Sequence, residues 1–129
     1  MCSKVKAYMR FSIEAKPSEK LCYKKDVDED QQQYVRIAAR ISNNDTHFLA
    51  LLNSENALWT PDRRHGQNKD GSYDWGFCGI NEKWHPDAVN DERFFTDPEW
   101  QIQKCYDYYK GGVTFYGNWE ASLKYFECS

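Results

Sequence analysis

The feature that most constrains the fold of this chain is the stretch 56–84, which lacks helical periodicity although helical patterns lie on both sides of it. Residues that interrupt regular structure divide this stretch, namely Pro61, Gly66, Gly71, Gly76 and Gly79. The segment 68–71 predicts a tight turn between two short strands. Helices that flank a small irregular β-region are typical of α+β folds. We therefore expect that class, mainly helical with a small central β-region.

Helical spacing of apolar residues predicts helices on both sides of this stretch. The first is expected over 28–41, where three acidic residues favour the N-terminus. The second is expected over 46–55, and the third over 98–110, between a proline that suits a helix start and a pair of glycines that ends it. A last short helix is expected to hold Trp119, Leu123 and Phe126.

The N-terminal segment has a different pattern. Apolar and polar residues alternate over 5–15, which predicts a half-buried strand or an ordered arm lying on the domain. We divide the chain into this N-terminal strand or arm, 1–27, and a main domain, 28–129. A length of 129 residues suits a single domain with a real core and is too short for two ordinary ones.

The charge pattern excludes several kinds of partner. The formal net charge is −3, and no lysine or arginine run forms a basic stripe, so we expect no nucleic acid partner. No apolar run approaches the ~18 residues of a membrane span, so we expect no membrane partner. Residues 1–10 lack the apolar region of a signal peptide, and we expect an exported protein to be seen here in its mature form.

Five cysteines are many for a cytosolic chain of this length, and they predict disulfides and a secreted or extracytoplasmic location. Cys105 lies on the inner face of the third helix and Cys78 in the β-region, so we expect these two to pair. Cys22 and Cys128 are the expected second pair, which leaves Cys2 free. The alternative is a set of scattered reduced thiols.

Two carboxylates are candidates for catalysis. Glu55 ends an apolar helix, where desolvation raises the pKa of a carboxyl and keeps it protonated as an acid. The alternative is a helix-end glutamate in water, which is the commoner case. Asp74 follows a polar turn, where a carboxylate stays ionised. One protonated and one ionised carboxyl form the pair that glycosidases use.

The segment 68–81 has the pattern Asn-x-Asp-Gly-Ser-x-Asp-aromatic-Gly-x-x-x-Ile-Asn, with a glutamate upstream at a helix end. This pattern resembles the catalytic region of c-type lysozymes. Over the same stretch it is similar to soluble lytic transglycosylases and goose-type lysozymes, whose helical landmarks resemble 100–102 and 115–117. The resemblance covers 34–117, is most specific over 55–84, and implies a lysozyme-like fold whose β-region flanks the active-site cleft.

Carried over by position, the resemblance implies that Glu55 is the general acid and that Asp74 is the nucleophile or charge stabiliser. It implies substrate-binding positions at Asn68, Asn81 and Trp84, the last stacking on a sugar face. Gly79 stands where the c-type family has glutamine, so one polar contact to substrate is missing or is supplied from elsewhere. The c-type disulfide framework is absent, so the likeness is to the catalytic core.

Three functions are consistent with these residues. The leading one is a muramidase, a secreted and antimicrobial glycosidase that hydrolyses the β-1,4 link between N-acetylmuramic acid and N-acetylglucosamine in peptidoglycan. A lytic transglycosylase would use Glu55 alone. The third is a non-catalytic saccharide-binding or interaction module, which Gly79 and the acidic pI of about 5.6 favour. The expected partner is peptidoglycan or a chitooligosaccharide, bound by a monomer.

No metal or other cofactor is expected. The turn at 68–71 does not fit a calcium loop, and the cysteines and histidines lack the spacing of a zinc site. A nucleophilic pair of Cys78 with His85 is disfavoured, because the related families place an apolar core residue at position 78. Since a sugar-stacking ring must face the cleft, we expect Trp84 to be partly exposed beside Glu55 and Asp74. Trp75 follows Asp74 and points to the other face of the sheet, so we expect it to be buried.

Overall fold

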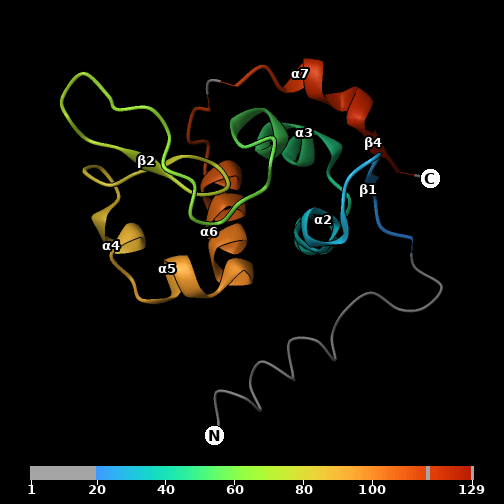
Figure 1. Cartoon of the computed structure of the whole chain (residues 1–129), viewed down its shortest axis with the longest axis horizontal. Helices are drawn as coiled ribbons and strands as arrows, with labels where there is room; N and C mark the ends of the chain where they lie inside the picture. Colours follow the sequence, from blue (N-terminus) through green and yellow to red (C-terminus); the bar gives the residue numbers. More distant parts are fainter. Residues whose placement is uncertain (1–19, 116, 129) are drawn as a thin grey trace, which may run out of the picture.

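The computed structural model describes residues 20–115 and 117–128, whose arrangement is shown in Figure 1. The expected strand or arm at 5–15 and Cys2 lie outside the described residues. Helices and two small antiparallel sheets make up the described part of the chain, which confirms the expected α+β class. Within the described ranges, no helix has the length and apolar character needed to cross a membrane.

The three longest helices lie where the sequence predicted them. Each begins after an aspartate whose side chain accepts a hydrogen bond from a backbone N–H of the first turn, namely Asp28, Asp45 and Asp97. The elements in chain order are β1 (Tyr23–Lys24), α2 (Glu29–Ile41), α3 (Thr46–Glu55), β2 (Asp74–Trp75), β3 (Ile80–Asn81), α4 (Pro86–Val89), α5 (Arg93–Thr96), α6 (Pro98–Lys110), α7 (Trp119–Ser122), the 3-10 helix η1 (Leu123–Tyr125) and β4 (Phe126–Glu127).

The β-region within 56–84 is a short hairpin. In the antiparallel pairing of β2 with β3, Asp74 lies opposite Asn81. A bridge between Arg64 and Trp75 extends the pairing on the other side of β2. The turn predicted at 68–71 connects Arg64 to β2. Gly71 adopts a φ of +89° there, which a glycine tolerates without strain.

The second sheet joins the two ends of the described chain. β1 pairs antiparallel with β4, with Lys24 opposite Phe126. The expectation that Phe126 belongs to the last helix is therefore wrong. The helical turns end at Tyr125, whose carbonyl accepts a hydrogen bond from Lys25 N at 2.8 Å, and the chain then extends along β1. In Figure 1 this sheet and the β2 hairpin lie on opposite sides of the molecule, with α3 and α6 between them.

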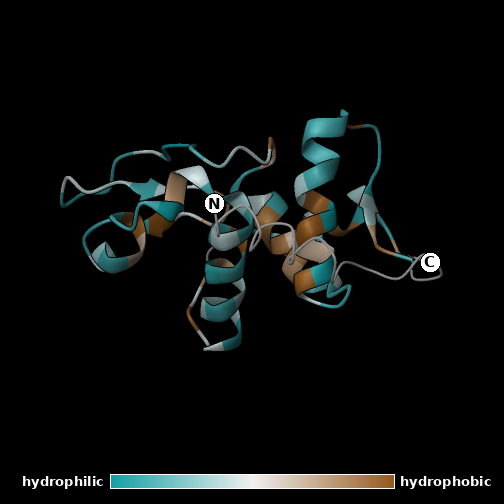
Figure 2. Ribbon diagram, turned by 90° about the horizontal axis from the view of Figure 1, so that it is seen from below, coloured by the Kyte–Doolittle hydropathy of each residue, from teal (hydrophilic) through white to brown (hydrophobic). Residues whose placement is uncertain are grey.

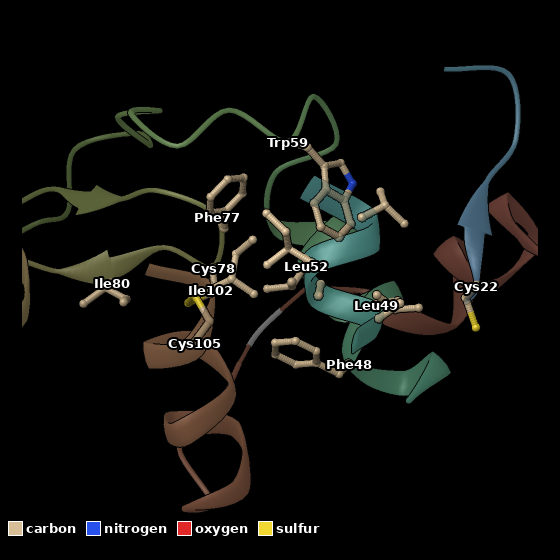
Figure 3. Packing of buried hydrophobic residues seen from close by; sticks show 14 of the residues in the cluster. Cys22, Phe48, Leu49, Leu52, Trp59, Phe77, Cys78, Ile80, Ile102 and Cys105 are labelled. Atoms are coloured by element: carbon tan, nitrogen blue, oxygen red, sulfur yellow. A yellow bond between two sulfur atoms is a disulfide. The ribbon is translucent and has the colours of Figure 1, made fainter. Parts of the chain in front are cut away.

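The core lies where these helices meet. Figure 2 shows hydrophobic segments gathered in the middle of the molecule and hydrophilic segments towards the free ends of the helices. Figure 3 shows Phe48, Leu49 and Leu52 of α3 in this core, with Trp59 and Phe77 from the 56–84 stretch near them. Trp59 is only 1% exposed. The irregular stretch therefore contributes large side chains to the same core as the helices.

Two buried amides fasten the irregular stretch to the helical part. Gln101 of α6 accepts a hydrogen bond from Phe77 N at 2.7 Å and donates to the carbonyls of Pro61 and Phe94. A Cβ on Gly76 would overlap the Gln101 side chain, which explains the glycine there. Asn56 donates to the Gly76 carbonyl at 3.1 Å, directly after α3.

Both expected disulfides are present. Cys78 is bonded to Cys105 with their Cα atoms 6.0 Å apart, and the bond is visible in Figure 3. Cys22 is bonded to Cys128, with a Cα separation of 4.1 Å. Disulfides form and persist in oxidising compartments, so these bonds fit the expected location outside the reducing cytosol.

Candidate active site

A groove of about 670 Å³ runs between the β2–β3 hairpin and the C-terminal half of α6. The end of α3 lies at its floor, and the segment 113–115 completes the wall formed by α6. The residues that line it are Glu55, Asn68, Lys69, Asp70, Asp74, Cys78, Gly79, Ile80, Asn81, Trp84, His85, Tyr108, Val113, Thr114 and Phe115. All six site residues expected from the sequence are among them.

Glu55 is the last residue of α3 and is half-buried. Its Oε2 accepts a hydrogen bond from the backbone N–H of Gly117 at 3.0 Å. Its Oε1 lies near Gly79, because a Cβ placed on that glycine would be 3.4 Å from this oxygen. The contact with Gly117 fixes the position of this carboxyl at the end of α3.

Asp74 has a different environment. Its Oδ1 accepts hydrogen bonds from Asn81 Nδ2 at 2.8 Å and from Asn68 Nδ2 at 3.0 Å. The amide of Asn68 also donates to the Ser72 carbonyl, and the amide of Asn81 donates to the Ser72 hydroxyl. These contacts hold both amides in place beside Asp74. Two donors directed at one oxygen suit a negatively charged carboxylate.

Gly79 lies close to both carboxylates. The position that its Cβ would occupy is 3.4 Å from Glu55 Oε1 and 3.7 Å from Asp74 Cβ. The distance between Glu55 Oε1 and Asp74 Cβ therefore cannot exceed the sum of these two distances. The same position is 3.4 Å from Cε1 of His65, a neighbour that the sequence did not indicate. The absence of a side chain at position 79 keeps this space beside both carboxylates open.

Trp84 is 70% exposed at the rim of the groove, which confirms the expected exposure. Its backbone N–H donates to Asn81 Oδ1 at 3.0 Å, so the residue that holds Asp74 also fixes the turn that presents this indole. Trp75 is half-buried, not fully buried as expected. Its indole N–H donates to Glu82 at 3.0 Å, which keeps that edge of the ring near the surface.

A third carboxylate, Asp70, also lines the groove. Hydrogen bonds from the hydroxyl and the backbone N–H of Ser72, at 2.6 and 2.9 Å, lower the pKa of Asp70. Lys83 lies 3.6 Å away across the rim. These hydrogen bonds stabilise the turn and favour the ionised form of Asp70, so we do not consider it a candidate for the proton donor.

The opposite wall was not expected from the sequence. The rings of His85 and Tyr108 lie 4.7 Å apart between centroids, and Val113 and Phe115 continue the apolar surface. Burial raises the pKa of Tyr108, and the charges of nearby aspartates add to the effect. Helical periodicity placed position 108 on a helix but gave no sign that it faces a groove.

The C-terminal segment is attached to α3 at several points beside Glu55. Apart from the Gly117 contact, the Trp119 ring stacks on His47 at 4.0 Å, and Asn53 donates to the hydroxyl of Ser122 at 3.3 Å. A Cβ on Gly117 would overlap the Ser54 hydroxyl. The segment 117–122, which we call the C-terminal strap, therefore packs closely against the helix that carries Glu55.

In comparisons with known proteins, no family model, curated protein or solved structure matches this chain. Among the described residues, no group of three or more histidine, cysteine, aspartate or glutamate side chains is arranged to hold a metal ion.

Proposed function

We propose that this chain is a lysozyme-like muramidase, which hydrolyses the β-1,4 link between N-acetylmuramic acid and N-acetylglucosamine in peptidoglycan. The observation that carries the proposal is the pair formed by Glu55 and Asp74. The two carboxylates share one groove and lie close to the same glycine, yet their hydrogen-bond partners differ. A pair of carboxyls in unlike environments is what a glycosidase needs. The resemblance of 68–81 to c-type lysozymes supports the same conclusion.

In the proposed reaction, the carboxyl of Glu55 donates a proton to the glycosidic oxygen. The bond from that oxygen to the anomeric carbon breaks, and its electron pair leaves with the oxygen. Asp74 meets the positive charge that develops on the anomeric carbon, either as a neighbouring anion or by forming a bond. Water then adds to that carbon and returns a proton to Glu55, which restores the starting state.

The groove also offers surfaces suited to sugars. Trp84 presents an exposed ring at one rim, while Tyr108 and Phe115 line the other side. Flat apolar rings stack on the faces of sugar rings, whereas amides and carboxylates bind hydroxyl groups. We therefore propose a glycan chain as the substrate.

Substitution of the two carboxylates tests this proposal. Glu55→Gln keeps the shape and removes the proton donor, so hydrolysis of purified peptidoglycan should fall by at least ~10²-fold. Asp74→Asn should cause a comparable loss if Asp74 meets the developing charge. The matched controls are Glu92→Gln and Asp62→Asn, two exposed carboxylates outside the groove. A Glu55→Gln variant that works at the wild-type rate would show that Glu55 is not the acid.

A further inference from the structure

A second cavity of about 440 Å³ lies away from the groove, and none of its lining residues is shared with the groove. It is formed by β1 and the turn after it, the start of α2, the turn after α3, and η1. We call it the lysine pocket. Its lining residues are Lys24, Lys25, Asp26, Val27, Gln31, Ala57, Leu58, Lys124 and Tyr125.

The pocket concentrates positive charge in a chain whose net charge is −3. Lys24 and Lys124 both lie near a single aromatic ring, with their Nζ atoms 5.9 and 5.4 Å from the centroid of Tyr125. Lys25 is the third lysine, and Asp26 is the only carboxylate among the lining residues. The pocket is therefore locally cationic on an acidic protein.

Lys24 is held in place by two hydrogen bonds, which leave part of the hydrogen-bonding capacity of its ammonium group available. It is only 7% exposed, and burial lowers its pKa. Its ammonium donates to the Ala57 carbonyl at 2.7 Å and to Gln31 Oε1 at 3.5 Å. An ammonium has three N–H groups, so one remains for a ligand. Within 20–115 and 117–128, no carboxylate forms an ion pair with Lys24 or Lys124.

Lys25 pairs with Glu127 at 3.4 Å, but both side chains are exposed, so the pair is weak and can be exchanged for a ligand. The apolar part of the pocket is exposed too, since Leu58 is 66% and Tyr125 43% accessible. Ammonium groups beside open apolar side chains suit a ligand that carries carboxylates and small apolar groups together.

We propose that the lysine pocket binds the peptide stems of peptidoglycan, which are short chains rich in carboxylates and methyl side chains. This proposal rests on the proposed function, because it supplies a second contact with the same polymer that the groove cleaves. It also gives an acidic protein a local means of binding an anionic wall. Attachment at two places on one polymer raises the effective concentration of glycan at the groove.

Sedimentation with insoluble peptidoglycan, stripped of phosphate polymers, tests this binding. The protein carries Glu55→Gln, so that the polymer stays intact. Adding Lys25→Glu and Lys124→Glu should weaken retention at least about tenfold, which corresponds to ~1.4 kcal/mol. The control adds Lys110→Glu, an exposed charge reversal at the end of α6 that lines neither cavity, and should retain the parent affinity. Circular dichroism checks that each variant is folded.

A second substrate separates stems from glycan. Glycan whose stems have been removed by an amidase should bind the parent and the lysine variants equally. Equal retention of parent and lysine variants on stem-bearing peptidoglycan would overturn the proposal. So would an equal loss of retention on both polymers, or retention that requires phosphate polymers.

The proposed function is tested separately, in protein that retains Glu55, by measuring cleavage of a soluble chitooligosaccharide. Lys25→Glu and Lys124→Glu should leave cleavage of this stem-free substrate unchanged. If the wild-type chain cleaves neither peptidoglycan nor the chitooligosaccharide while stem-dependent retention persists, the muramidase proposal fails. Binding of peptide stems by the lysine pocket would then still hold.

Discussion

The two walls of the groove reach the same cleft by different means. In the hairpin wall, 68–81, Asp74 is held by hydrogen bonds from residues close to it in sequence, Asn68 and Asn81. The helical wall, formed by α6 and 113–115 with Gly117 beside it, depends on distant contacts such as the hydrogen bond from Gly117 N–H to Glu55. A short motif thus positions Asp74 within the hairpin wall, whereas the helical wall takes its geometry from the whole fold.

Breaking the hairpin wall should have the larger effect on activity. Asn81→Asp keeps the size of the side chain, removes a donor and places a second carboxylate beside Asp74. Activity on peptidoglycan should fall by about 10²–10³-fold, the range for losing a charge-stabilising group in an active site. The control is Asn90→Asp, an exposed change at the end of α4. An active Asn81→Asp variant would mean that this contact does not prepare Asp74 for its role.

The two disulfides sharpen the comparison through stability. Replacing Cys78 and Cys105 with serine should lower the free energy of unfolding by about 2–4 kcal/mol and, in protein that is still folded, also lower activity, because this bond ties the hairpin wall to α6. Replacing Cys22 and Cys128 opens a larger loop, with a separation of 106 residues, but does not touch the groove.

Denaturant unfolding and peptidoglycan hydrolysis should be measured on both double variants at a temperature where both are folded. Activity is expected to fall only in the variant that lacks the Cys78–Cys105 bond. The reverse result would mean that this bond has no part in aligning the walls.

The smallest effect is expected at the C-terminal strap. His47→Ala removes the ring on which Trp119 stacks, and an aromatic pair of this kind is worth about 0.5–1.5 kcal/mol. We expect kcat to fall by about 2–10-fold with little change in KM, because Gly117 loses its alignment with Glu55 while the groove surface remains. His47→Phe keeps a stacked ring and should restore kcat. A change confined to KM in His47→Ala would contradict this role.

The sequence allowed the hairpin wall to be predicted because its determinants are local. The turn at 68–71 and the carboxylate at 74 follow from residue types at short spacing, and the exposure of Trp84 was expected from the resemblance of this segment to c-type lysozymes. Helix starts were predictable for the same reason, since each long helix begins after an aspartate. The disulfide between Cys78 and Cys105 followed from the inner face of one helix and the position of the β-region.

The helical wall could not be predicted in this way. Whether Tyr108 faces a groove or solvent depends on how α6 crosses the hairpin, which no periodicity of α6 alone contains. The contact of Gly117 with Glu55 joins residues far apart in sequence, and a backbone N–H leaves no mark on residue type. Phe126 was misplaced because the pairing of β4 with β1 outweighed a local helical pattern.

The central claim is that Glu55 and Asp74 hydrolyse peptidoglycan. The most direct test is to digest purified peptidoglycan with the wild-type chain in ¹⁸O-labelled water and to determine the masses of the products by mass spectrometry. Hydrolysis with Glu55 as acid predicts muramic acid ends that are reducing and carry one ¹⁸O atom. Unlabelled 1,6-anhydro ends would show that the sugar's own hydroxyl attacks, so that the chain is a transglycosylase. Peptidoglycan that releases no fragments at all would contradict the assignment of Glu55 and Asp74 as a catalytic pair.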